Sequence, residues 1–103
     1  MAITFEMIKQ VTAQLYERSL KQIPDDTRQA LVQASSRETN ETGRRTLQIM
    51  IESADAARSR QSLVCSDSGV PVYFMQIGTQ AQFDGNVKQA IEEGFAELVA
   101  TIN

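Results

Sequence analysis

Apolar residues in the first part of the chain recur at the three- and four-residue spacing of an amphipathic helix. Ile8, Val11 and Leu15 predict a helix from about Thr4 to Gln22, and the Thr4 hydroxyl can cap it by accepting a free backbone N–H. Pro24 must end this helix, because its ring disfavours helical geometry in the residue that precedes it. The chain is therefore expected to open with one long helix.

Two further helices are predicted before the middle of the chain. The second runs from Pro24 to about Glu38, since proline suits a first helical turn and two acidic residues follow it. Its apolar face is weak, so we expect it to be peripheral. The third runs from about Arg44 to Arg60, with Asn40 or Thr42 as its cap. Its apolar side, interpreted as core packing, consists of Leu47, Met50, Ile51, Ala54 and Ala57.

The pattern changes to that of a strand at Val72–Ile77. Phe74 and Met75 fall on opposite faces of this run, so both faces are expected to be covered, as in an interior strand. A last helix, which Asp84 can cap, carries an apolar stripe, and Gly94 within the stripe indicates close packing. The stripe consists of Val87, Ile91, Phe95, Leu98 and Ile102. We therefore predict a mostly helical α+β fold, with three helices, a polar loop, a buried strand and a C-terminal amphipathic helix.

Composition narrows the possible functions. The chain of 103 residues suits a single domain, residues 1–103, and its net charge of −3 argues against a nucleic-acid partner. No signal peptide is expected, and no apolar run approaches the roughly 20 residues of a membrane helix. A single cysteine indicates a reducing, cytoplasmic setting. The sequence contains no histidine, which excludes Ser/His and Cys/His catalytic pairs.

The predicted strand raises a difficulty, because one strand cannot satisfy its own backbone hydrogen-bonding groups. We therefore expect its partners to come from another chain or from the rest of a longer protein.

Candidate chemistry gathers in the polar loop Cys65–Gly69, directly before the predicted strand. An isolated Cys65 is most often a small buried hydrophobe, although a thiolate is also a natural ligand for a soft metal or an iron–sulfur cluster. Asp67, between Ser66 and Ser68, similarly suits an Asx-turn that needs no catalysis. The residues alone indicate a polar site before a strand and leave its chemistry open.

The run Leu63–Gly69, LVCSDSG, with the apolar residues that lead to Gly78, resembles the first cluster-ligand segment of the iron–sulfur hydro-lyases. These are the class I fumarases and the α subunits of L-tartrate dehydratase and of two-subunit fumarate hydratases, whose pattern is approximately Cys-Gln-Asp-Thr-Gly. The turn Glu38-Thr39-Asn40 also fits, and the resemblance extends from about Met7 to Ile102. It implies that the chain is the N-terminal segment of a hydro-lyase α domain, incomplete relative to the family.

The resemblance also implies roles for the loop residues. Cys65 matches one of three cysteines that ligate a [4Fe-4S] cluster, whose fourth iron acts as a Lewis acid on substrate. Asp67 matches an acidic residue implicated in proton transfer to or from the substrate hydroxyl, and Ser66 and Ser68 match substrate-contacting positions. The expected substrate is a small hydroxy dicarboxylic acid. Ser66 stands where fumarases commonly have glutamine, so another hydroxy acid than malate is possible.

The expected partners follow from what the sequence lacks relative to the family. The other two cysteines, the substrate-binding arginines and the β part are absent, so the chain alone is expected to hold no cluster and to catalyse nothing. The remainder of the α subunit and a β subunit or domain should complete an oligomeric enzyme. The alternative is a non-catalytic helical interaction module, or a decayed remnant, in which Cys65 is structural.

Overall fold

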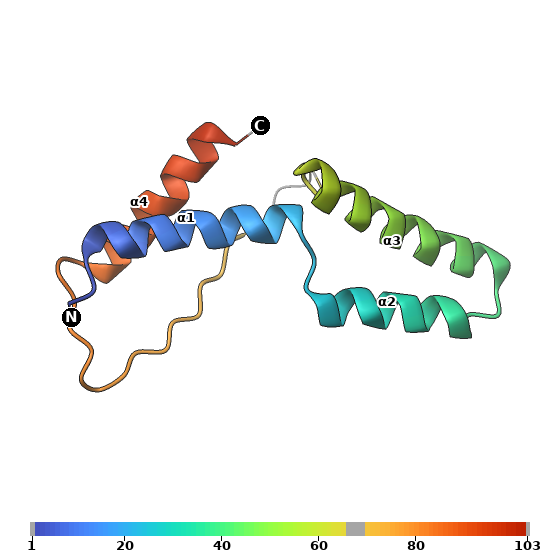
Figure 1. Cartoon of the computed structure of the whole chain (residues 1–103), viewed down its shortest axis with the longest axis horizontal. Coiled ribbons are helices and arrows are strands. Elements are labelled where there is room, and N and C mark those ends of the chain that lie inside the picture. Colours follow the sequence, from blue (N-terminus) through green and yellow to red (C-terminus); the bar gives the residue numbers. More distant parts are fainter. Residues whose placement is uncertain (1, 66–69, 103) are drawn as a thin grey trace. The chain divides into compact units, whose positions relative to one another are not determined.

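The computed structural model describes residues 2–65 and 70–102, and its path is drawn in Figure 1. The helices of the described part are α1 (Phe5–Lys21), α2 (Asp25–Arg37), α3 (Glu41–Arg60) and α4 (Val87–Thr101). The chain divides into two compact units. The terminal unit comprises Met1–Arg18 and Ser68–Asn103, and the hairpin unit comprises Ser19–Asp67.

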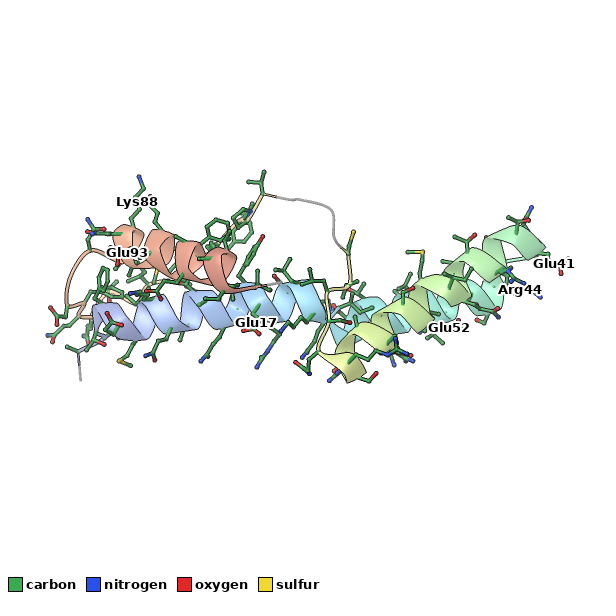
Figure 2. The ribbon with its side chains drawn as sticks, turned by 90° about the horizontal axis from the view of Figure 1, so that it is seen from above. Glu17, Glu41, Arg44, Glu52, Lys88 and Glu93 are labelled. Atoms are coloured by element: carbon green, nitrogen blue, oxygen red, sulfur yellow. The ribbon has the colours of Figure 1, made fainter. Side chains whose placement is uncertain are left out.

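In the terminal unit, α1 packs against α4, and both helices are seen side by side in Figures 1 and 2. Gly94 lies at the closest approach, since a Cβ added there would lie 3.1 Å from the Thr12 Cβ and closer still to the Lys9 carbonyl oxygen. The close packing predicted at Gly94 is therefore confirmed. The rings of Tyr16 and Phe95 meet edge to face with their centroids 4.9 Å apart. The buried residues of this unit are Ile8, Thr12, Ala90, Gly94 and Leu98.

The start of α1 is fixed by two local interactions. The Thr4 hydroxyl accepts a hydrogen bond from the Met7 backbone N–H at 3.2 Å, which confirms the predicted cap. Ile3 forms an isolated parallel bridge with Phe83, in which the Ile3 N–H donates to the Gln82 carbonyl and the Ile3 carbonyl accepts from the Asp84 N–H. These bonds hold the N-terminal residues against the segment that leads into α4.

In the hairpin unit, α2 and α3 run antiparallel (Figure 1). Ala54 and Ala57 of α3 are buried, whereas α2 has no buried residue, as its weak apolar face predicts. The Asn40 side chain caps α3 by accepting from the Gly43 N–H at 3.0 Å. The Arg44 guanidinium donates to the Glu38 carbonyl at the end of α2, which ties the two helices together at their turn.

Two predicted helix starts were wrong. The third helix begins at Glu41 rather than Arg44, because the Asn40 cap places Gly43 within the first turn instead of before it. The last helix is capped by Asn86 and not by Asp84, since the Asn86 side chain accepts from the Gln89 N–H three residues ahead. The predicted positions of the four helices are otherwise close to those observed.

The predicted buried strand was also wrong, and with it the α+β assignment. Residues 70–77 form extended backbone without strand pairing, and the described residues contain no strand at all. Phe74 is 95% exposed, and Met75, predicted on the opposite face, is 46% exposed, so neither face is covered as an interior strand would require. The physical reason is that no second strand lies among the described residues to accept its backbone bonds. The fold of the described chain is therefore mostly helical.

No helix in the described ranges is both long enough and apolar enough to cross a membrane.

Candidate functional site

The approach to the candidate loop is built by the end of α3 in the hairpin unit. Gln61 adopts the left-handed conformation with φ of 53°, and its N–H donates to the Ala57 carbonyl, which ends the helix. The Ser62 N–H donates to the same carbonyl at 3.0 Å. The Val64 N–H then donates to the Leu20 carbonyl at 2.8 Å, near the end of α1. The residue directly before Cys65 is thus anchored by a backbone hydrogen bond.

Cys65 itself is exposed. This exposure argues against the interpretation of Cys65 as a small buried hydrophobe. The other predicted site residues, Ser66, Asp67 and Ser68, lie outside the described residues. Of the candidate loop, the structure therefore describes only Cys65 and the anchored residues that precede it.

A second feature is a groove in the terminal unit that the sequence patterns did not predict. It has a volume of about 320 Å³ and lies between α1 and the extended segment that contains Tyr73. The Tyr73 hydroxyl donates to the Thr12 carbonyl at 3.4 Å, and burial raises the pKa of this phenol above its usual value of 10.0. The lining residues are Ile3, Met7, Ile8, Val11, Thr12, Leu15, Tyr73, Phe74, Met75 and Ile91. The signal in the sequence was the surplus of apolar residues at Val72–Ile77, which was interpreted as a strand.

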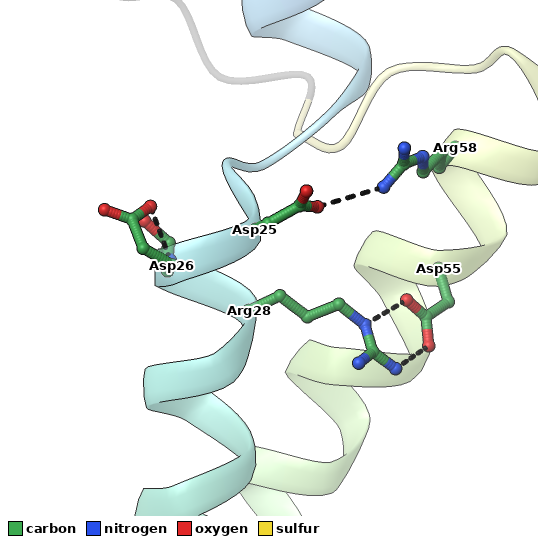
Figure 3. A network of polar contacts seen from close by, with 6 residues as sticks. Asp25, Asp26, Arg28, Asp55 and Arg58 are labelled. Atoms are coloured by element: carbon green, nitrogen blue, oxygen red, sulfur yellow. Dashed lines mark hydrogen bonds and ion pairs between the residues drawn. The ribbon is translucent and has the colours of Figure 1, made fainter.

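A pair of ion bridges joins α2 to α3 in the hairpin unit (Figure 3). Arg28 donates two hydrogen bonds to Asp55, from Nε and from one terminal nitrogen, each 2.8 Å long. This bidentate bond holds the pKa of the Asp55 carboxyl below its usual value of 3.8. Arg58 bonds Asp25 at 3.4 Å. The sequence signal is that an acid precedes a base by three residues on both helices, an order that an antiparallel pairing brings into register.

Comparison with known proteins identifies the family. The model of the fumarate hydratase (Fumerase) family matches residues 9–103, which include the whole candidate loop and all of α2, α3 and α4. The chain belongs to the fumarate hydratase family. The predicted resemblance is thereby confirmed at the level of the family.

One curated relative supports the same assignment. The chain is 31% identical over 86 residues to the Methanocaldococcus jannaschii protein named "Putative L(+)-tartrate dehydratase subunit alpha". The match covers 84% of this chain and 30% of the relative, so the chain spans about three-tenths of that protein's length. No solved structure matches the chain. The family membership and the relative's name both point to a hydro-lyase.

The fumarate hydratase family implies an iron–sulfur cluster, and this chain carries part of the donor set that such a cluster needs. The exposed Cys65 offers one thiolate, the ligand type that such clusters use. The 103 residues contain no second cysteine and no histidine, and no group of three potential metal ligands occurs among the described residues. A [4Fe-4S] cluster takes three or four thiolates. The chain by itself does not fit a whole cluster, and Cys65 fits one position of a set that other residues would have to complete.

Proposed function

We propose that the chain is the N-terminal part of the α region of a [4Fe-4S]-dependent hydro-lyase, of the fumarate hydratase or tartrate dehydratase type. The reaction is the reversible dehydration of a small 2-hydroxy dicarboxylic acid. The observation that carries this proposal is the family match over residues 9–103, with the exposed thiol of Cys65 inside it. The match of 31% identity to a protein named as a tartrate dehydratase subunit supports the same reaction class.

Each residue of the candidate loop has a role in this proposal. Cys65 supplies one of three thiolate ligands, and the remaining two come from parts of the enzyme beyond these 103 residues. Asp67 transfers a proton to or from the substrate hydroxyl. Ser66 and Ser68 contact the substrate with their hydroxyl groups. In the dehydration, the hydroxyl leaves one carbon and a proton leaves its neighbour, so that a double bond and one water molecule form.

The proposal requires partners. The Methanocaldococcus jannaschii relative is named as a subunit alpha, which fits an enzyme assembled from more than one part. We infer that the rest of the α region and a β subunit or domain complete the active site in an oligomer within the reducing cytoplasm. The chain alone is then inactive.

Co-expression tests the proposed function. The chain is produced together with the polypeptides encoded downstream of the Asn103 codon and purified without oxygen, and the hydration of fumarate and the dehydration of L-tartrate are measured. An active assembly is expected, and Asp67→Asn should lower kcat by about 10²- to 10⁴-fold, the usual contribution of one proton-transfer group. Asp84→Asn is the matched control, because Asp84 lies outside the loop and is exposed.

Two results would contradict the proposed function. Downstream sequence without further cysteine-bearing hydro-lyase segments would favour the decayed remnant. An active assembly in which Asp67→Asn and Asp84→Asn gave the same kcat would remove Asp67 from the reaction.

A further inference from the structure

The extended segment Val72–Ile77 of the terminal unit has a backbone without protein partners in the described chain. None of its N–H or carbonyl groups forms a hydrogen bond with another described residue. Its one hydrogen bond to such a residue comes from a side chain, the Tyr73 hydroxyl. Extended backbone of this kind presents a row of donors and acceptors that a second extended chain can pair with.

The large apolar side chains of the same segment, those of Val72, Phe74, Met75 and Ile77, are exposed. Val72, Phe74 and Ile77 are 68%, 95% and 52% exposed, respectively. Isolated exposed apolar residues are ordinary, but a contiguous run is typical of an interaction surface. Since the burial of apolar side chains is favourable, covering this run would contribute to binding.

The segment borders the groove of the terminal unit, so the uncovered surface continues onto α1. Met7, Val11 and Leu15, one face of that helix, are 43%, 51% and 53% exposed and line the groove together with Phe74 and Met75. No charged side chain is among the ten lining residues. The groove therefore lacks the positively charged groups that a dicarboxylate would need, whereas it suits the apolar side chains of a polypeptide.

We propose that Val72–Ile77 and this groove form a docking site for a β-strand from the remainder of the hydro-lyase α region. This inference rests on the proposed function and names the partner surface. The length of the relative supports the choice of occupant, because 30% of that protein is matched and most of its length has no counterpart here. The arriving strand bonds the backbone of Val72–Ile77 and places its apolar side chains over α1.

Hydrogen exchange on the full chain tests this inference. The probe is the polypeptide encoded downstream of the Asn103 codon, and exchange at the amides of Val72–Ile77 is measured with and without it. Slowing by at least about tenfold is expected upon complex formation. Proline removes a backbone N–H, so Phe74→Pro or Met75→Pro, whose N–H groups point to opposite edges, should weaken the complex about tenfold or more. Val99→Glu is the control, since Val99 is 51% exposed on α4 and does not line the groove.

Several results would overturn the docking site. These are absence of a complex, unchanged exchange at Val72–Ile77 within a complex, or equal binding by both proline variants and the Val99→Glu control. Protection of the segment in a dimer of the chain alone would make a second copy the occupant. The two proposals fail separately: protection without hydro-lyase activity would leave the docking site standing, and activity without protection would leave the function standing.

Discussion

Gly94 allows the backbone of α4 to approach α1 more closely than any side chain at that position would permit. The atoms nearest to a Cβ added there belong to the Lys9 carbonyl and to the Thr12 Cβ, both on α1. The neighbouring contacts, the Tyr16–Phe95 ring pair and the bridge from Lys9 to Glu97 at 2.6 Å, depend on the same approach. The absence of a Cβ at Gly94 therefore allows α1 and α4 to pack at this short distance.

Gly94→Ala should destabilise the chain by about 1–3 kcal/mol, because an added methyl group must push helix backbone apart. Gly78→Ala is the control, since a Cβ at Gly78 would meet nothing within 4 Å. Chemical unfolding followed by far-ultraviolet circular dichroism measures both variants. Equal stability of Gly94→Ala and the unmodified chain would show that α1 and α4 do not pack as described.

The chemistry of Cys65 could be predicted only in part from its own neighbours. The local sequence left a buried thiol and a metal ligand open, and the exposure of Cys65 argues against the first. The roles of Ser66, Asp67 and Ser68 depend on the resemblance to iron–sulfur hydro-lyases and remain predictions. A thiol needs its distant partners to define its chemistry, and those partners do not lie within 103 residues.

At the scale of elements, the helices were predictable from local signals, namely apolar periodicity in α1, α3 and α4 and the Pro24 start with its two acidic residues in α2. The predicted cap of α4 was wrong because Asp84 and Asn86 both have side chains that can cap a helix. The helix begins at Val87, so Asn86 is the residue directly before it, and its side chain accepts from the Gln89 N–H. The strand at Val72–Ile77 was wrong for a different reason. A helix bonds within itself, whereas a strand requires a partner that the described residues do not supply.

The hairpin of α2 and α3 should be sensitive to acid through Asp55. Its pKa is lowered by the hydrogen bonds from Arg28, so the folded state binds its proton less readily than the unfolded state. The stabilisation is present above the usual value of 3.8 and is lost as the pH falls through the lower pKa of the folded state. The melting temperature of Asp55→Asn should therefore decrease less than that of the unmodified chain as the pH falls below 3.8.

Glu52→Gln is the control for this pH dependence, because Glu52 lies on the same helix without an ion pair among the described residues. Thermal unfolding between neutral and strongly acidic pH, followed by circular dichroism, measures all three proteins. The bidentate bond of Figure 3 would be refuted if Asp55→Asn and Glu52→Gln gave the same curve as the unmodified chain.

At the scale of the whole molecule, three features support our proposal that the chain is part of a larger enzyme. The family match fills residues 9–103, the chain spans about three-tenths of its relative, and an apolar groove with an extended segment stands uncovered in the terminal unit. In addition, the chain has one cysteine, whereas a [4Fe-4S] cluster needs three or four. We infer that the chain brings one ligand and a docking surface to an assembly that supplies the rest.

The iron content of that assembly tests this inference most directly. The chain is co-expressed with the polypeptides encoded downstream of it and purified without oxygen, and iron and sulfide are measured together with the electron paramagnetic resonance spectrum. The unmodified assembly should carry a [4Fe-4S] cluster, and Cys65→Ser should lose the cluster and the hydro-lyase activity while the polypeptides still co-purify. An iron-loaded, active assembly that Cys65→Ser leaves unchanged would contradict the role of Cys65 as a cluster ligand.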